Sequence, residues 1–121
     1  MLPRPAYYLH PYDENHIIGF GKDTVEGKGW NDQSQAYYQG MKVAIFDVTD
    51  VTHPVEMDQE IIGDRGTDSE LLNNHKALLF SREKNLLAFP VTVAKLSDPK
   101  QDITAYGNFA FQGAYIYKID L

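Results

Sequence analysis

The stretch HKALLFSREKNLLAF, residues 75–89, repeats a pattern that the chain first shows at residues 6–20, AYYLHPYDENHIIGF. Each stretch contains a short apolar run, a polar turn and a second apolar run. A long polar stretch follows each copy, and a further apolar run then appears at residues 43–48 and at residues 115–119. A unit of several short strands that occurs twice predicts a repeat architecture.

These apolar runs predict an all-β fold with antiparallel sheets and no helix longer than a turn or two. The strands expected with most support are residues 43–48, 76–80, 86–89 and 115–119. Residues 55–62 carry many charges, as the edge strand of a sheet often does. The residues expected to be mostly buried are Ile17, Phe20, Val43, Ile45, Leu78, Phe80, Leu87, Phe89 and Ile116.

The strand count gives four strands in a first unit, about residues 6–63, and three in a second, about residues 71–121. A four-stranded antiparallel sheet is the blade of a β-propeller, so residues 1–121 read as one domain of about one and three-quarter blades. Two blades cannot close a ring. The chain is therefore expected to self-associate as a symmetric dimer, either through the exposed edge strand 115–119 or by packing blade on blade.

The amino-acid composition argues against several classes of binding partner and of site chemistry. The 121 residues carry a net charge of −6, and neither a basic cluster nor an apolar run of membrane-spanning length is present. Nucleic acid and anionic membrane surfaces are therefore not expected as partners. The chain has no cysteine, which excludes disulfides and zinc–thiolate sites. No cofactor or metal is expected, and the first residues do not read as a signal peptide.

Three segments carry a resemblance to a known family: GMKVAIFDV at residues 40–48, IIGDRGT at 61–67 and HKALLF at 75–80. The chain resembles, from Tyr8 to Leu121, the uncharacterised secreted or surface-attached β-propeller-domain proteins of bacilli and related prokaryotes. The resemblance implies a propeller fold, an extracellular or cell-envelope location with any signal lying upstream, and no established activity. Family members are much longer, so the chain corresponds to part of such a propeller.

Two loops hold the candidate ligand-binding residues. The loop DRGTDSE at residues 64–70 contains Asp64, Arg65 and Asp68; its oxygen-rich side chains suit Ca²⁺, but their spacing is not that of an EF-hand. The alternative is a solvated inter-blade loop with local pairs. The polar stretch at residues 21–39 ends in aromatic residues that either anchor a ligand or cover bare core; the candidates are Trp30, Tyr37 and Tyr38.

The remaining motifs favour structural roles. The histidines at positions 10, 16, 53 and 75 lack metal-ligand spacing, and the chain has no GxSxG, Walker or GxGxxG pattern. The leading hypothesis is a non-enzymatic binding or scaffold module within an extracytoplasmic β-propeller, with a protein or cell-envelope component as partner. The alternative is part of a surface hydrolase or metal-dependent enzyme whose site needs the complete propeller. A third possibility is an exposed blade edge that accepts a partner's strand.

Overall fold

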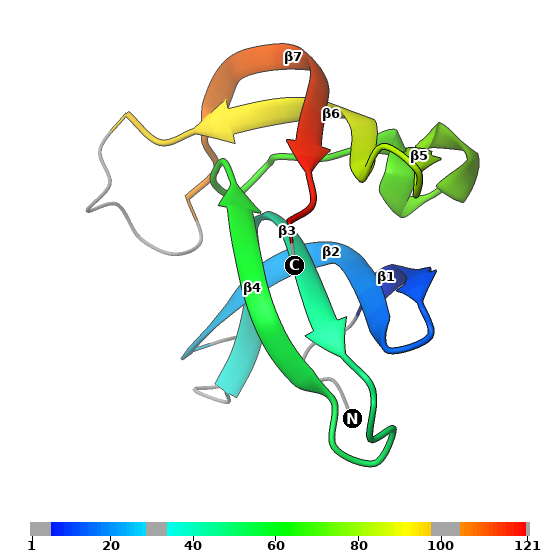
Figure 1. Cartoon of the computed structure of the whole chain (residues 1–121). Helices are drawn as coiled ribbons and strands as arrows, with labels where there is room; N and C mark the ends of the chain where they lie inside the picture. Colours follow the sequence, from blue (N-terminus) through cyan, green and yellow to red (C-terminus); the bar gives the residue numbers. More distant parts are fainter. Residues whose placement is uncertain (1–5, 29–33, 98–104, 121) are drawn as a thin grey trace.

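The chain folds into two antiparallel sheets that face each other (Figure 1). The computed structural model describes residues 6–28, 34–97 and 105–120. The first sheet has the order β1-β2-β3-β4, with β1 at Ala6–Asp13, β2 at His16–Lys28, β3 at Ser34–Asp47 and β4 at Val55–Ile62. The second has the order β5-β6-β7, with β5 at Leu79–Ser81, β6 at Leu86–Lys95 and β7 at Asn108–Lys118. The predicted all-β class, with four strands followed by three, is confirmed.

The polar stretch at residues 21–39 is mostly strand, which corrects the expectation of a long loop. β2 runs to Lys28 and β3 begins at Ser34, so the two form a long hairpin. Thr24 pairs with Tyr38 and Val25 with Tyr37 across it. β-branched and aromatic residues in directly opposed positions stabilise a sheet, and they outweigh the polar residues around them.

The expected strand at residues 76–80 is also corrected. The segment begins as a 3₁₀ helix, η3 at His75–Ala77, and the strand β5 is only three residues long. The side chain of Asn74 accepts a hydrogen bond from the amide of Lys76, at 3.1 Å, and so caps the helix. An asparagine cap of this kind offers the backbone an alternative to the sheet. A second 3₁₀ helix, η2 at Glu70–Leu72, precedes it and buries Leu71 and Leu72.

A single hydrophobic core fills the space between the sheets. At its centre Phe20 of β2 meets Phe89 of β6 edge to face, with ring centroids 5.8 Å apart. Edge-to-face geometry is favourable for aromatic pairs because the positive ring edge meets the negative ring face. The other buried members of this cluster are Tyr12, Ile18, Met41, Val43, Ile62, Leu71, Leu72, Leu87, Val91 and Val93.

Most of the predicted core residues lie in or against this cluster, but Ile17 and Ile116 do not. Phe20, Val43, Leu87 and Phe89 are buried, and Ile45, Leu78 and Phe80 pack against the core while partly buried. Ile17 is only half-buried. Ile116 is 70% exposed, because the alternation along β7 turns Tyr115, Tyr117 and Ile119 towards the core instead.

The segment that connects the first sheet to the second, residues 63–68, forms hydrogen bonds with one edge of β6. The amide of Asp64 donates to the carbonyl of Ala94 at 2.7 Å. The buried hydroxyl of Thr67 accepts from the Ala94 amide at 3.0 Å and donates to the Ala94 carbonyl at 3.2 Å. Asp68 and Thr92 then exchange two main-chain hydrogen bonds, at 3.0 and 2.8 Å. This segment therefore extends the β5 side of the second sheet.

Replacing Phe89 with alanine should destabilise the fold by about 3–5 kcal/mol, because a large side chain is removed from the centre of the core. Ile116→Ala is the matched control on the same sheet, and it should cost less than about 0.5 kcal/mol because Ile116 faces solvent. Urea unfolding of the dilute protein, followed by circular dichroism, measures both changes. Equal costs at the two positions would show that the faces of β6 and β7 are assigned incorrectly.

Candidate functional site

Arg65, a predicted ligand-binding residue, joins the two sheets at one end of their interface. Its guanidinium donates to the carbonyl of Tyr38 at 2.9 Å and to the hydroxyl of Tyr106 at 3.0 Å. The same group lies 4.4 Å from the ring centroid of Tyr106 and 5.5 Å from that of Tyr37. The guanidinium therefore makes cation–π contacts with both rings. The structure thus brings Arg65, in the segment after β4, together with Tyr37 and Tyr38 of β3.

The two acidic candidates, Asp64 and Asp68, accept hydrogen bonds from backbone amides. One carboxylate oxygen of Asp64 accepts from the amide of Leu96 at 2.8 Å, and one of Asp68 accepts from the amide of Ser69 at 2.8 Å. Asp68 also lies 3.8 Å from the amine of Lys22. Trp30 lies outside the described residues. Ligand binding by any of these six candidates stays a prediction.

The histidines contact neighbouring side chains, some of them distant in sequence. The rings of His10 and His16 lie at hydrogen-bond distance from the Tyr8 hydroxyl, 2.8 Å, and from an Asp13 carboxylate oxygen, 2.7 Å. His75 belongs to the 3₁₀ helix η3, and it stacks on Tyr8 with centroids 5.4 Å apart. Within residues 6–28, 34–97 and 105–120, no three His, Asp or Glu residues are placed to hold a metal ion.

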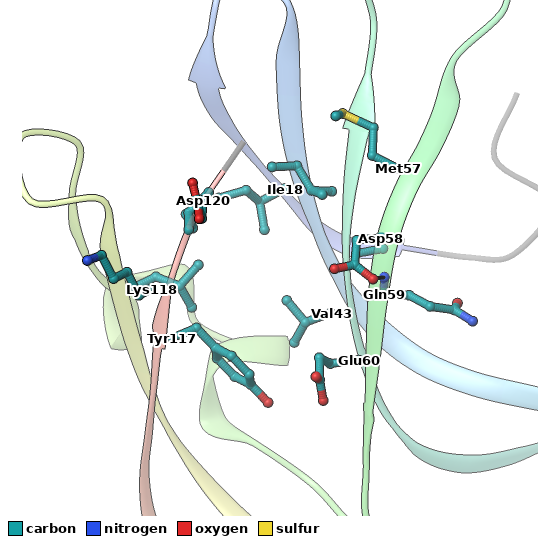
Figure 2. Close-up of a pocket in the computed structure, with 13 residues that line it drawn as sticks. Ile18, Val43, Met57, Asp58, Gln59, Glu60, Tyr117, Lys118 and Asp120 are labelled. Carbon is teal, nitrogen blue, oxygen red and sulfur yellow. Dashed lines mark hydrogen bonds between the residues drawn. The ribbon is translucent and has the colours of Figure 1, made fainter.

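The structure also contains an open cavity of about 430 Å³ that the sequence did not predict. It lies between the last two strands of the first sheet and the end of β7, as Figure 2 shows. Both sheets contribute apolar side chains to it, and these belong to the core or pack against it. The apolar lining consists of Ile18, Val43, Ala44, Ile45, Met57, Leu87 and Ile119.

The rim of this cavity is acidic. Asp58 and Glu60 of β4 line one side, and Asp120 lines the other side with Tyr117 and Lys118 of β7. In Figure 2 the amine of Lys118 points away from the cavity, while Glu60 and the ring of Tyr117 lie across it from each other. Burial raises the pKa of Tyr117 to about 12, with smaller contributions from the charge of Glu60 and from Tyr115. A negative potential over a partly desolvated floor disfavours anions and favours cations.

One family model covers all of the residues that form these two sheets. The model of the β-propeller domain family matches residues 6–121. The chain belongs to the β-propeller domain family. An uncharacterized protein of the archaeon Archaeoglobus fulgidus is 30% identical over 89 residues, which are 74% of this chain and 12% of that protein. The chain therefore spans only a small part of this relative.

No solved structure matches the chain. Among the described residues of this β-propeller domain, no helix has the length and apolar character needed to cross a membrane. In family terms, the first sheet is a four-stranded blade, and the second is a blade of three strands.

Sequence reasoning missed the inter-blade cavity because its lining comes from separate segments whose facing direction depends on register. The one signal in the sequence is the pair Asp58 and Glu60, two residues apart and hence on the same face of a strand. From the sequence alone, two acidic residues on that face predict that it is exposed to solvent. The blade packing places it opposite Tyr117 instead.

Glu60→Gln should lower the pKa of Tyr117 from about 12 part of the way towards its ordinary value of about 10, because burial, the larger cause, remains. The folded state holds this pKa above its unfolded value. The contribution of neutral Tyr117 to the stability of the fold is therefore fully present below about pH 10, and it is lost as the pH rises through about 12. NMR titration of ¹³C-labelled tyrosine rings measures the pKa directly.

Glu56→Gln is the control for this titration. It removes an equal charge from the same strand, where Glu56 pairs with Lys42 at 2.9 Å outside the cavity. The pKa of Tyr117 should stay at about 12 in this variant. If the two substitutions shift the pKa equally, Glu60 does not face Tyr117 in solution.

Proposed function

We propose that this β-propeller domain is a non-enzymatic binding or scaffold module of an extracytoplasmic protein, and that its ligand enters the inter-blade cavity. The cavity is the observation that carries the proposal. Its volume of about 430 Å³ lies within the usual range of small-ligand and side-chain pockets, and it combines an apolar floor with a few polar groups. The extracytoplasmic location rests on the resemblance to secreted and surface-attached propeller proteins.

Enzymatic function has less support in the geometry. The acidic candidates Asp64 and Asp68 hold backbone amides, which is a structural use of a carboxylate. Arg65 is held by Tyr38 and Tyr106 rather than directed into the cavity. The alternative of a hydrolase or metal-dependent enzyme needs groups from the rest of a complete propeller.

Met57→Trp should abolish binding by filling the mouth of the cavity, since Met57 lines the cavity and is 47% exposed. Val55→Trp is the matched control, because Val55 is also exposed on β4 but lies outside the lining. The immobilised protein and both variants would be incubated with solubilised bacterial cell-envelope fractions, and bound components would be compared by mass spectrometry. A component should be retained by the wild type and Val55→Trp only.

Two results would contradict this function. The first is identical retention by all three proteins. The second is turnover of generic ester, phosphoester or glycoside substrates that disappears in Asp64→Ala or Asp68→Ala, which would favour the hydrolase alternative.

We also propose that the chain self-associates, blade on blade, through the outer face of the second sheet. Leu79 and Ile116 lie on this face on either side of Ala88, and they are 72% and 70% exposed. Light scattering at tens of micromolar should give at least twice the chain mass of 13.7 kDa. Ile116→Lys should reduce the mass to that of one chain. A monomeric wild type over the whole range would contradict the proposal.

A further inference from the structure

We propose that the contact between β1 and the segment from η3 to the turn after β5 is acid-sensitive, and that protonation of His10 loosens the packing of the two sheets along it. We name this contact the β1 seam. It joins the sheets on the side of the molecule where β1 and β5 lie (Figure 1). None of its residues lines the inter-blade cavity. The seam consists of Tyr8, His10 and Tyr12 from β1, and of His75, Phe80, Arg82 and Asn85 from the other side.

Alternate residues of β1 face the second sheet. In the ladder between β1 and β2, Tyr8 pairs with Phe20 and His10 pairs with Ile18, and both of these partners are buried. Tyr12 is itself a buried member of the core. Because alternate residues of a strand point to the same face, the side chain of His10 lies between those of the two tyrosines on the inner side of the first sheet.

His10 makes the central contact of the seam. Its ring meets the ring of Phe80 at a steep angle, with centroids 4.5 Å apart, and its Nδ1 atom lies 2.8 Å from the hydroxyl of Tyr8. The flanking contacts are the stack of Tyr8 on His75, with centroids 5.4 Å apart, and the hydrogen bond that the Tyr12 hydroxyl donates to the side-chain oxygen of Asn85 at 2.5 Å. A change in the charge of His10 therefore acts on the middle of the seam.

The seam provides no counter-ion for a protonated His10. Among the described residues His10 forms no ion pair, and the nearby carboxylate of Asp13 is held by His16 at 2.7 Å. Arg82 adds positive charge, since its guanidinium carbon lies 4.4 Å from the ring centroid of Tyr12. Burial lowers the pKa of His10 below its ordinary value of 6.5, because a partly desolvated ring disfavours the charged form. The other titratable or charged groups of η2 and η3 are the exposed Glu70, His75 and Lys76.

A proton on His10 also changes its hydrogen bond with Tyr8. A neutral ring can accept the hydroxyl proton of Tyr8 at Nδ1, whereas a protonated ring donates from both nitrogens. The hydroxyl must then act as the acceptor and direct its own proton elsewhere. Since Tyr8 carries the stack on His75, protonation of His10 disturbs two of the three contacts of the seam.

The pH window follows from the lowered pKa of His10. The unfolded chain binds this proton more readily than the folded chain, so the stability that neutral His10 provides is present above about pH 6.5. It is lost as the pH falls through the lowered value of the folded state. Hydrogen bonds hold the pKa of three carboxyls below 3.8, so their contribution is lost only under that value; they are Asp13, Asp47 and Asp50. The range from about pH 7.5 to about pH 5 therefore separates the histidines from these carboxyls.

The test is urea unfolding of the dilute 121-residue chain, followed by circular dichroism at about pH 7.5 and about pH 5. The equilibrium constant for unfolding of the wild type should rise at least about twofold on acidification. His10→Phe keeps a ring against Phe80 but cannot be protonated, so it should remove this rise. If His10→Phe does not fold, the equally uncharged His10→Gln decides.

Two further histidine variants are the controls. His53→Gln should keep the rise, because the side chain of His53 is 83% exposed and lies outside the seam. His75→Phe separates the two histidines of the seam, and it should also keep the rise. The proposal is overturned if the rise survives in the folded His10 variant, or if His75→Phe removes it.

Hydrogen exchange locates the effect within the fold. Amide exchange, measured by mass spectrometry and corrected for its intrinsic dependence on pH, should become faster at about pH 5 in residues 6–13 and 75–81, while β6 and β7 remain protected. An equal loss of protection in all strands would contradict a local loosening of the seam. Met57→Trp, which tests the cavity, should keep the acid response, so this proposal and the proposed binding function can fail separately.

Discussion

The backbone of Ala94 accepts a hydrogen bond from the Asp64 amide through its carbonyl, while its own amide donates to the hydroxyl of Thr67. These bonds attach the single connection between the sheets to the edge of β6. Gly63 makes the approach possible: its φ of 69° suits glycine, and a side chain there would overlap the Thr67 hydroxyl. With this connection in place, the apolar face of the second sheet packs against the first, and the core forms around Phe20 and Phe89.

The cavity is a direct consequence of packing four strands against three. Among the described residues, no strand lies opposite the inner face of β4 at the level of Asp58 and Glu60, so carboxylates can occupy positions that would otherwise be covered. Burying an unpaired carboxylate is costly, and these two avoid that cost by remaining solvated.

The predicted ligand-binding residues and the cavity occupy different parts of the interface. Arg65, Tyr37 and Tyr38 form contacts that hold β3 to the segment after β4, and the Arg65 guanidinium donates to the Tyr38 carbonyl and to the Tyr106 hydroxyl. The cavity, in contrast, presents carboxylates without cationic partners among the described residues. The contacts that hold the sheets together are thus separate from the acidic rim, which allows the rim to be altered with little effect on the fold.

The sequence alone determined the fold class, the number of strands and most of the core, because apolar periodicity and turn chemistry are local properties. It could not determine the paired hairpin at residues 21–39, whose polar strands are stabilised by cross-strand partners, or the 3₁₀ turn capped by Asn74, where a local hydrogen bond replaced the expected strand. Only the tertiary structure decided which face of β7 is buried: a shift of one residue exchanges Tyr117 for Ile116. The tertiary structure alone also forms the cavity, since its walls come from segments that only the packing of the two sheets brings together.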